Sequence, residues 1–136
     1  MRRIVMLAVF VLALVPAFSA AQAAGDKGTV QRSWISRTSG GEAEKSFSVK
    51  GVKKLYANFV WKVPAKAGLP LQIEWRDPAG VLRAVWKDKT LKSDKQGTRL
   101  YAWVGSGVVK GKVGTWHAVL AVDGKRIGTS KFHIVK

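Results

Sequence analysis

Apolar and polar residues alternate at every second position along several segments, and this period of two constrains the fold more than any other feature. Leu55, Ala57, Phe59, Trp61 and Val63 share one face of an extended strand. The same alternation recurs at 71–76, 82–87, 99–104 and 116–122, with weaker strand signals at 30–37 and 47–49. No window after the N-terminal segment keeps the 3.6-residue period of an amphipathic helix. The pattern predicts seven or eight short strands and an all-β fold.

Turn residues separate these segments. Asp77-Pro78-Ala79-Gly80 has the composition of a tight turn, because proline presets φ and glycine tolerates the left-handed region. Asp123-Gly124 predicts a two-residue hairpin turn between the last two strands. Gly105-Ser106-Gly107 is interpreted as a flexible loop. Short strands and frequent turns favour an antiparallel β-sandwich.

Residues 114–134 contain a pattern that also occurs in other proteins: Gly114-x-Trp116-x₃-Leu120-x-Val122-Asp123-Gly124-x₂-Ile127-x₄-Phe132-x-Ile134. It resembles the closing hairpin of small immunoglobulin-like domains in bacterial secreted proteins. The segment Trp75-Arg76-Asp77-Pro78-Ala79-Gly80 is similar to an inner hairpin of those domains. The resemblance implies an immunoglobulin-like antiparallel sandwich and a binding or accessory role, and it transfers no functional residue.

The N-terminus predicts export. Arg2 and Arg3 precede an apolar run from Ile4 to Val15, and Ala21-Gln22-Ala23 fits a signal-peptidase site. The run is too short for a spanning helix, which needs ~20 apolar residues. We therefore expect a signal peptide at 1–23, cleaved after Ala23, a single domain at 24–136, and a secreted or periplasmic protein without a transmembrane segment.

Charge and cysteine content narrow the function classes. The chain has a formal charge of +16, and loss of Arg2 and Arg3 with the signal leaves +14. Such an excess attracts polyanions, although lysines spread along a chain also serve solubility alone. The absence of cysteine excludes disulfides, thiol catalysis and cysteine metal sites.

The two histidines are the first candidates for chemistry. A regular ladder after Asp123-Gly124 would turn Phe132 away from the core, so we predict one β-bulge, at Gly128. With that bulge, His117 and His133 share the outer face, diagonal to each other. No third ligand lies in the hairpin, so we expect two solvated histidines, no metal and no cofactor.

Enzymatic arrangements do not assemble from the remaining residues. The chain contains no G-x-S-x-G motif, and Ser106 has no nominated base. Glu42 and Glu44 lie in a Gly/Ser-rich segment, and Asp77 and Asp123 are turn formers. We therefore expect a protein that is not an enzyme.

The aromatic residues offer one candidate binding surface. Trp61, Trp75, Trp86 and Trp116 fall on predicted core faces, and Trp34 is ambiguous. Two assignments of the strand at 99–104 stay open. If Leu100, Ala102 and Val104 face inward, then Arg99, Tyr101 and Trp103 form an exposed aromatic and cationic stripe. The alternative assignment turns the aromatic side chains inward.

Lysines complete the candidate site. Lys87, Lys89, Lys92 and Lys95 form the densest stretch, and smaller clusters lie at Lys53-Lys54 and at Lys110 and Lys112. Solvated lysines also protect sheet edges from aggregation.

Together these features predict an exported, non-enzymatic module that engages an anionic envelope component: phospholipid, lipopolysaccharide, teichoic acid or acidic glycan. The alternative is a protein-interaction module that docks on another exported protein. Nucleic acid fits the charge but not the expected compartment, and the sequence does not define an oligomeric state.

Overall fold

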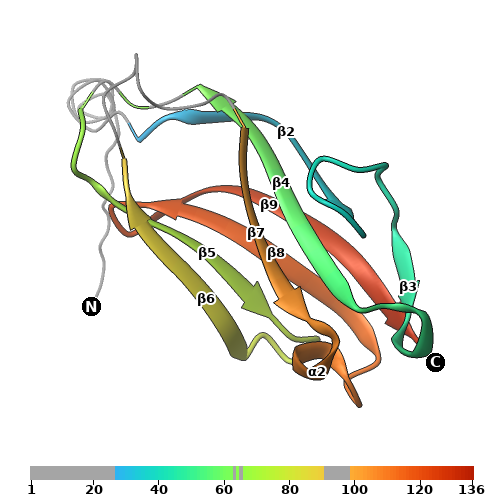
Figure 1. The fold of residues 1–136 in the computed structure, drawn as a ribbon. Helices are drawn as coiled ribbons and strands as arrows, with labels where there is room; N and C mark the ends of the chain where they lie inside the picture. Colours follow the sequence, from blue (N-terminus) through green and yellow to red (C-terminus); the bar gives the residue numbers. More distant parts are fainter. Residues whose placement is uncertain (1–26, 63, 65, 91–98) are drawn as a thin grey trace, which may run out of the picture.

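The computed structural model describes residues 27–62, 64, 66–90 and 99–136. The predicted signal peptide, its cleavage after Ala23, Lys92 and Lys95 lie outside these residues. Within the described residues, eight strands make two sheets that pack face to face (Figure 1). In chain order the strands are β2 (Thr29–Ser36), β3 (Ser46–Ser48), β4 (Lys54–Lys62), β5 (Pro70–Arg76), β6 (Leu82–Lys89), β7 (Arg99–Gly105), β8 (Gly114–Val122) and β9 (Lys125–Val135).

One sheet has the order β2-β4-β7 and the other the order β3-β9-β8-β5-β6. All pairs are antiparallel except β3 and β9, which run parallel. The predicted all-β, immunoglobulin-like sandwich is confirmed, with this one parallel edge strand as a difference from the expected antiparallel pattern. No helix among the described residues is long and apolar enough to cross a bilayer.

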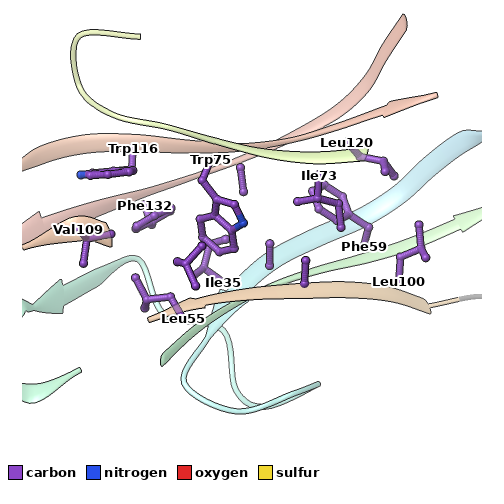
Figure 2. Packing of buried hydrophobic residues seen from close by; sticks show 14 of the residues in the cluster. Ile35, Leu55, Phe59, Ile73, Trp75, Leu100, Val109, Trp116, Leu120 and Phe132 are labelled. Carbon is purple, nitrogen blue, oxygen red and sulfur yellow. The ribbon is translucent and has the colours of Figure 1, made fainter. Parts of the chain in front are cut away.

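The core forms where the inner faces of the two sheets meet. Figure 2 shows Trp116, Phe132 and Trp75 of the five-stranded sheet opposite Leu55 and Ile35 of the three-stranded sheet. Phe132 stacks on Trp116 at 6.2 Å between ring centroids and meets Trp75 edge-on at 5.9 Å. This aromatic cluster occupies the positions that strand alternation assigned to the core.

Both predicted turns are confirmed. Asp123 and Gly124 have φ values of 51° and 81°, as a two-residue hairpin with right-twisted strands requires. In the turn from Asp77 to Gly80, the N–H of Gly80 donates to the carbonyl of Asp77 at 2.8 Å, and Gly80 has φ 83°.

Three local predictions are wrong. The β8–β9 bulge falls one residue earlier than expected, because Gly128 pairs with Leu120 and Arg126 with Ala121, which leaves Ile127 as the extra residue. A second bulge between β5 and β6 turns Leu82 to the surface, where it is 44% exposed. The segment after Gly105, expected to be a flexible loop, forms a short helix, α2 (Ser106–Val109), because buried Val109 anchors it. A 3₁₀ turn, η2, occupies Val49–Gly51.

The two sides of the sandwich differ. On one side β2 and β9 approach closely, and a Cβ added at Gly128 would lie 2.5 Å from Cγ2 of Val30. On the other side the edge strands β6 and β7 are separated by a groove. The sandwich is therefore closed along β2/β9 and open along β6/β7.

Candidate binding site

The stripe predicted on residues 99–103 is exposed. Leu100, Ala102 and Val104 are buried, whereas Tyr101 is 44% and Trp103 is 51% exposed, and Arg99 is exposed as well. The inward assignment of the aromatic residues is therefore wrong. The reason is that Leu100, Ala102 and Val104 complete the inner face of the three-stranded sheet.

Strand β4 places two more groups against this stripe. Tyr56 lies opposite Trp103 in the ladder, and its ring centroid is 6.0 Å from that of Tyr101. Nζ of Lys54 lies 4.2 Å from the ring centroid of Trp103, and Cζ of Arg99 lies 5.1 Å from that of Tyr101. Cation–π contacts of this kind hold charged side chains beside aromatic surfaces.

The buried side chain of Asn58 holds the guanidinium of Arg99. Asn58 lies opposite Tyr101 on β4, and its side chain is fully buried under the segment that follows β2. Its Oδ1 accepts from the backbone N–H of Gly40 at 2.9 Å and from Nη1 of Arg99 at 3.2 Å, and its Nδ2 donates to Oγ of Ser36 at 2.9 Å. A buried amide with these partners fixes the guanidinium at the end of the stripe.

The stripe also forms one wall of the groove between β6 and β7. This groove has a volume of ≈ 610 Å³. Arg99, Tyr101 and Trp103 line it from β7, and Val85, Trp86 and Asp88 line it from β6. Since β4 lies on the opposite side of β7, Lys54 and Tyr56 support the stripe without filling the groove. The arrangement can take an extended ligand that presents rings to Tyr101 and Trp103 and negative charge to the Arg99 guanidinium, which lies on the β4 side of the stripe.

The structure does not bring Lys87 and Lys89 into the groove. Lys87 pairs with Gln72 on the outer face of the five-stranded sheet, whereas Asp88 pairs with buried Leu71 and lines the groove. Both lysines are exposed, and neither lines the groove. The two lysines and the stripe therefore belong to separate surfaces.

The other tryptophans have mainly structural environments. Trp61, Trp75 and Trp116 are buried, as predicted, whereas Trp86 is only partly buried at the groove. Trp34 is half-buried: its Nε1 donates to the carbonyl of Gly41 at 2.8 Å. Trp103 is thus the tryptophan that the described residues leave most open to a ligand.

The histidines lie on the outer face of the five-stranded sheet. His117 pairs with Lys131 and Thr115 with His133, which gives the predicted diagonal arrangement. Nδ1 of His133 lies 2.9 Å from Oγ1 of Thr115. Within the described ranges, no three His, Cys, Asp or Glu side chains gather as a metal site would require.

One carboxylate near His117 is held by other partners. Glu74 is buried, and its carboxylate accepts from Nε2 of Gln72 at 2.6 Å and from Nε of Arg76 at 2.8 Å. Arg76, His117 and Arg126 line a shallow hollow of ≈ 350 Å³ on this face. Glu74 is not among the residues that line it.

Sequence reasoning missed Tyr56, Asn58, Val85 and Trp86 as parts of the site. Asn58 gave one usable signal, since it is a lone amide within the apolar strand from Leu55 to Trp61. Val85 and Trp86 on β6 gave no such signal, because the way the two sheets pack decides which edge strands lie across the groove from each other.

Comparisons with known proteins show similarity in fold. No family model matches the chain, and no curated protein matches it. Among solved structures, the chain is similar to an alkylpurine DNA glycosylase, AlkC, from Pseudomonas fluorescens, bound to DNA containing an abasic site analog. The TM-score is 0.51 at 12% identity, over 88% of this chain and 33% of that one. The chain thus spans about a third of the glycosylase's length.

Two further structures are similar. One is an immunoglobulin-like protein from Pseudomonas aeruginosa, with a TM-score of 0.49 and 11% identity over 80% of this chain and 90% of that one. The other is β-glucosidase 3B from Thermotoga neapolitana in complex with α-D-glucose, with a TM-score of 0.46 and 14% identity over 77% and 16% of the two chains. The class defined by sheet order and core is an immunoglobulin-like β-sandwich.

Proposed function

We propose that this protein is an exported, non-enzymatic binding module that engages an anionic component of the cell envelope through the stripe of Arg99, Tyr101 and Trp103. The observation that carries the proposal is the exposure of two aromatic rings on β7, each beside a cation: Arg99 of the same strand and Lys54 of the neighbouring strand β4. The predicted signal peptide supplies the compartment, and the charge of +14 that remains after its loss supplies long-range attraction to polyanions.

Within the anionic candidates, the groove favours an acidic glycan or a phosphate-bearing wall polymer. Aromatic faces offer flat apolar area to sugar rings, and a guanidinium pairs with carboxylate or phosphate through two parallel hydrogen bonds. Asn58 holds Arg99 in place before a ligand arrives, so less side-chain entropy is lost on binding.

A direct test is pull-down of the mature protein with lipopolysaccharide, wall polymers, acidic polysaccharides and anionic liposomes at low and high salt. We expect salt-sensitive binding that Trp103→Ala weakens about tenfold, because an exposed aromatic anchor contributes on the order of 1–2 kcal/mol. Arg126→Ala removes an exposed cation from the outer face of the other sheet and serves as the control. Absence of salt-sensitive binding to every polyanion would refute the proposal.

A second candidate, docking on another exported protein, is favoured by the apolar residues around β6. Val81, Leu82 and Val85 are 46%, 44% and 40% exposed, and within the described residues β6 hydrogen-bonds only to β5 along its length. A free edge strand can accept a strand from a partner. Salt-resistant capture of one exported protein, abolished by Leu82→Ser and unaffected by Trp103→Ala, would support this candidate over the first.

A further inference from the structure

Six lysines from three distant segments gather at one end of the sandwich. They are Lys50 and Lys53 between β3 and β4, Lys54 at the start of β4, Lys110 and Lys112 after α2, and Lys136 after β9. We call this surface the lysine end. Figure 1 shows α2, the end of β3 and the C-terminus at this same end of the molecule.

Two hollows and one backbone hydrogen bond connect these segments. Lys50, Lys110 and Lys136 line one of ≈ 460 Å³ together with Val49 and Val113. Lys53 and Lys54 line another, of ≈ 340 Å³, with Arg37. The N–H of Ser106 donates to the carbonyl of Lys53 at 3.0 Å, which ties the start of α2 to the segment before β4.

The lysine end is charged without internal compensation. Ion pairs among the described residues use Lys27, Arg37, Arg76, Arg83 and Arg126 as their cations. None of them uses one of the six lysines. No Asp or Glu occurs at 46–54, 105–116 or 131–136. The positive potential at this end is therefore available to an external anion.

The backbone that presents the lysines is anchored in the core. Val109, the residue before Lys110, is fully buried. Nε1 of buried Trp116 donates to the carbonyl of Lys112 at 2.8 Å. Buried Val52 holds the segment that carries Lys50 and Lys53. A binding surface that is already ordered loses less conformational entropy when it docks.

Apolar side chains stand among the lysines. Val113 is 49% exposed and Val135 is 42% exposed, each one residue from a lysine of this end. Clustered basic residues bind anionic headgroups, and exposed apolar residues among them reach the boundary of headgroups and acyl chains. A soluble polyanion would use the charge and leave the valines unused.

We infer that the lysine end docks on a membrane surface rich in anionic phospholipid. This goes beyond the proposed function, because it assigns a second surface and a different partner. The hollow lined by Lys50, Lys110 and Lys136 shares no residue with the stripe or its groove. Lys54 is the lysine of this end that also contacts the stripe, through Trp103. One module could then hold an envelope polymer near a membrane.

The test is co-sedimentation of the mature protein with vesicles of equal parts phosphatidylglycerol and phosphatidylcholine, and with vesicles of phosphatidylcholine alone. Wild type is expected to bind only the anionic vesicles and to dissociate at high salt. Lys50→Glu with Lys110→Glu should weaken binding on the order of a hundredfold, because each basic residue near such a surface contributes about 1 kcal/mol and reversal adds repulsion. Val113→Ser should weaken it by a smaller factor.

The matched control is Lys125→Glu with Lys131→Glu, which makes the same charge change at exposed positions of β9. Equal losses in the two double variants, or no binding of wild type to anionic vesicles, would overturn the inference. If the glutamate variant does not fold, Lys50→Gln with Lys110→Gln and Lys136→Gln replaces it, and folding is checked by near-ultraviolet circular dichroism.

Binding to a soluble acidic polysaccharide, measured in parallel, separates the two proposals. Loss of vesicle binding alone in the lysine variant, and of polysaccharide binding alone in Trp103→Ala, supports both. Polysaccharide binding without vesicle binding by wild type overturns only the membrane inference, and the reverse result overturns only the glycan site.

Discussion

Asn58 illustrates how one buried residue links the segment after β2 to the candidate site. It lies in a strand of apolar residues, yet its buried amide is satisfied by Gly40, Ser36 and Arg99. An unsatisfied amide at this depth would cost about 1–3 kcal/mol. The same bonds that make its burial tolerable also fix Arg99 at the end of the stripe.

Asp77 gives a prediction at the residue scale. Burial by itself would raise the pKa of its carboxyl, but bonds from the N–H of Val81, from Nε of Arg83 and from the N–H of Ala79 outweigh it and hold the pKa below 3.8. Its stabilisation is therefore fully present above the ordinary aspartate pKa and is lost as pH falls through the lowered value. Urea unfolding midpoints should decline as the pH falls below about 4.

Asp77→Asn should lower the urea midpoint near neutral pH and flatten that decline. The physical reason is that an amide cannot form the ion pair with Arg83, which joins Nε and Oδ2 at 2.8 Å. Asp88→Asn, which changes an exposed carboxylate, is the control. An unchanged acid profile in Asp77→Asn would contradict the assignment.

At the scale of elements, the closed side of the sandwich depends on the absence of a side chain at Gly128. The bulge at Ile127 places Gly128 opposite Leu120, and Val30 of β2 packs directly over it. This contact brings the three-stranded sheet against β9 and closes the sandwich on that side.

Gly128→Ala should destabilise the fold by about 1–3 kcal/mol, because the new Cβ would lie 2.5 Å from Cγ2 of Val30. In a Val30→Ala background the cost should be clearly smaller, since the clashing atoms are gone. Urea denaturation measures both changes in the free energy of unfolding. Gly107→Ala in α2, where an added Cβ meets nothing within 4 Å, is the control. Additive effects in the double variant would argue against this packing.

At the scale of the whole molecule, uncompensated charge is the dominant property. The chain carries 24 Lys and Arg against 8 Asp and Glu. Several described acids are already paired with cations, which leaves the lysine end without partners. Repulsion among like charges disfavours the compact state, and salt screens it.

The urea midpoint of the mature protein should therefore rise when sodium chloride is added. Lys50→Gln with Lys110→Gln should raise the midpoint at low salt and reduce its salt dependence, because two repelling charges are removed from one surface. Lys125→Gln with Lys131→Gln is the comparison, and we expect a smaller effect from it. A midpoint that falls with salt in wild type would show that ion pairs outweigh repulsion.

Strand positions, both turns and most core residues were predictable because they depend on local rules. Alternation identifies β4 and β7 from side-chain chemistry alone, and Asp123-Gly124 defines a hairpin through backbone preference. The bulges at Ile127 and beside Leu82 were not predictable to the residue, because a bulge is placed by the fit of two sheets. The site follows the same division: Tyr101 and Trp103 were candidates, whereas Trp86 and Asn58 were not.

The sequence by itself determined the class of fold, the net charge and the alternation that puts Arg99, Tyr101 and Trp103 on one face. Only the tertiary structure decided that this face points outward, because Leu100, Ala102 and Val104 are needed to complete the core. It also decided that Lys87 and Lys89 lie away from the stripe, and that Lys50, Lys110 and Lys136 meet at one end. The physical reason is that the need to bury apolar side chains decides which face of a strand points inward. How the two sheets pack decides which residues far apart in the sequence come close together.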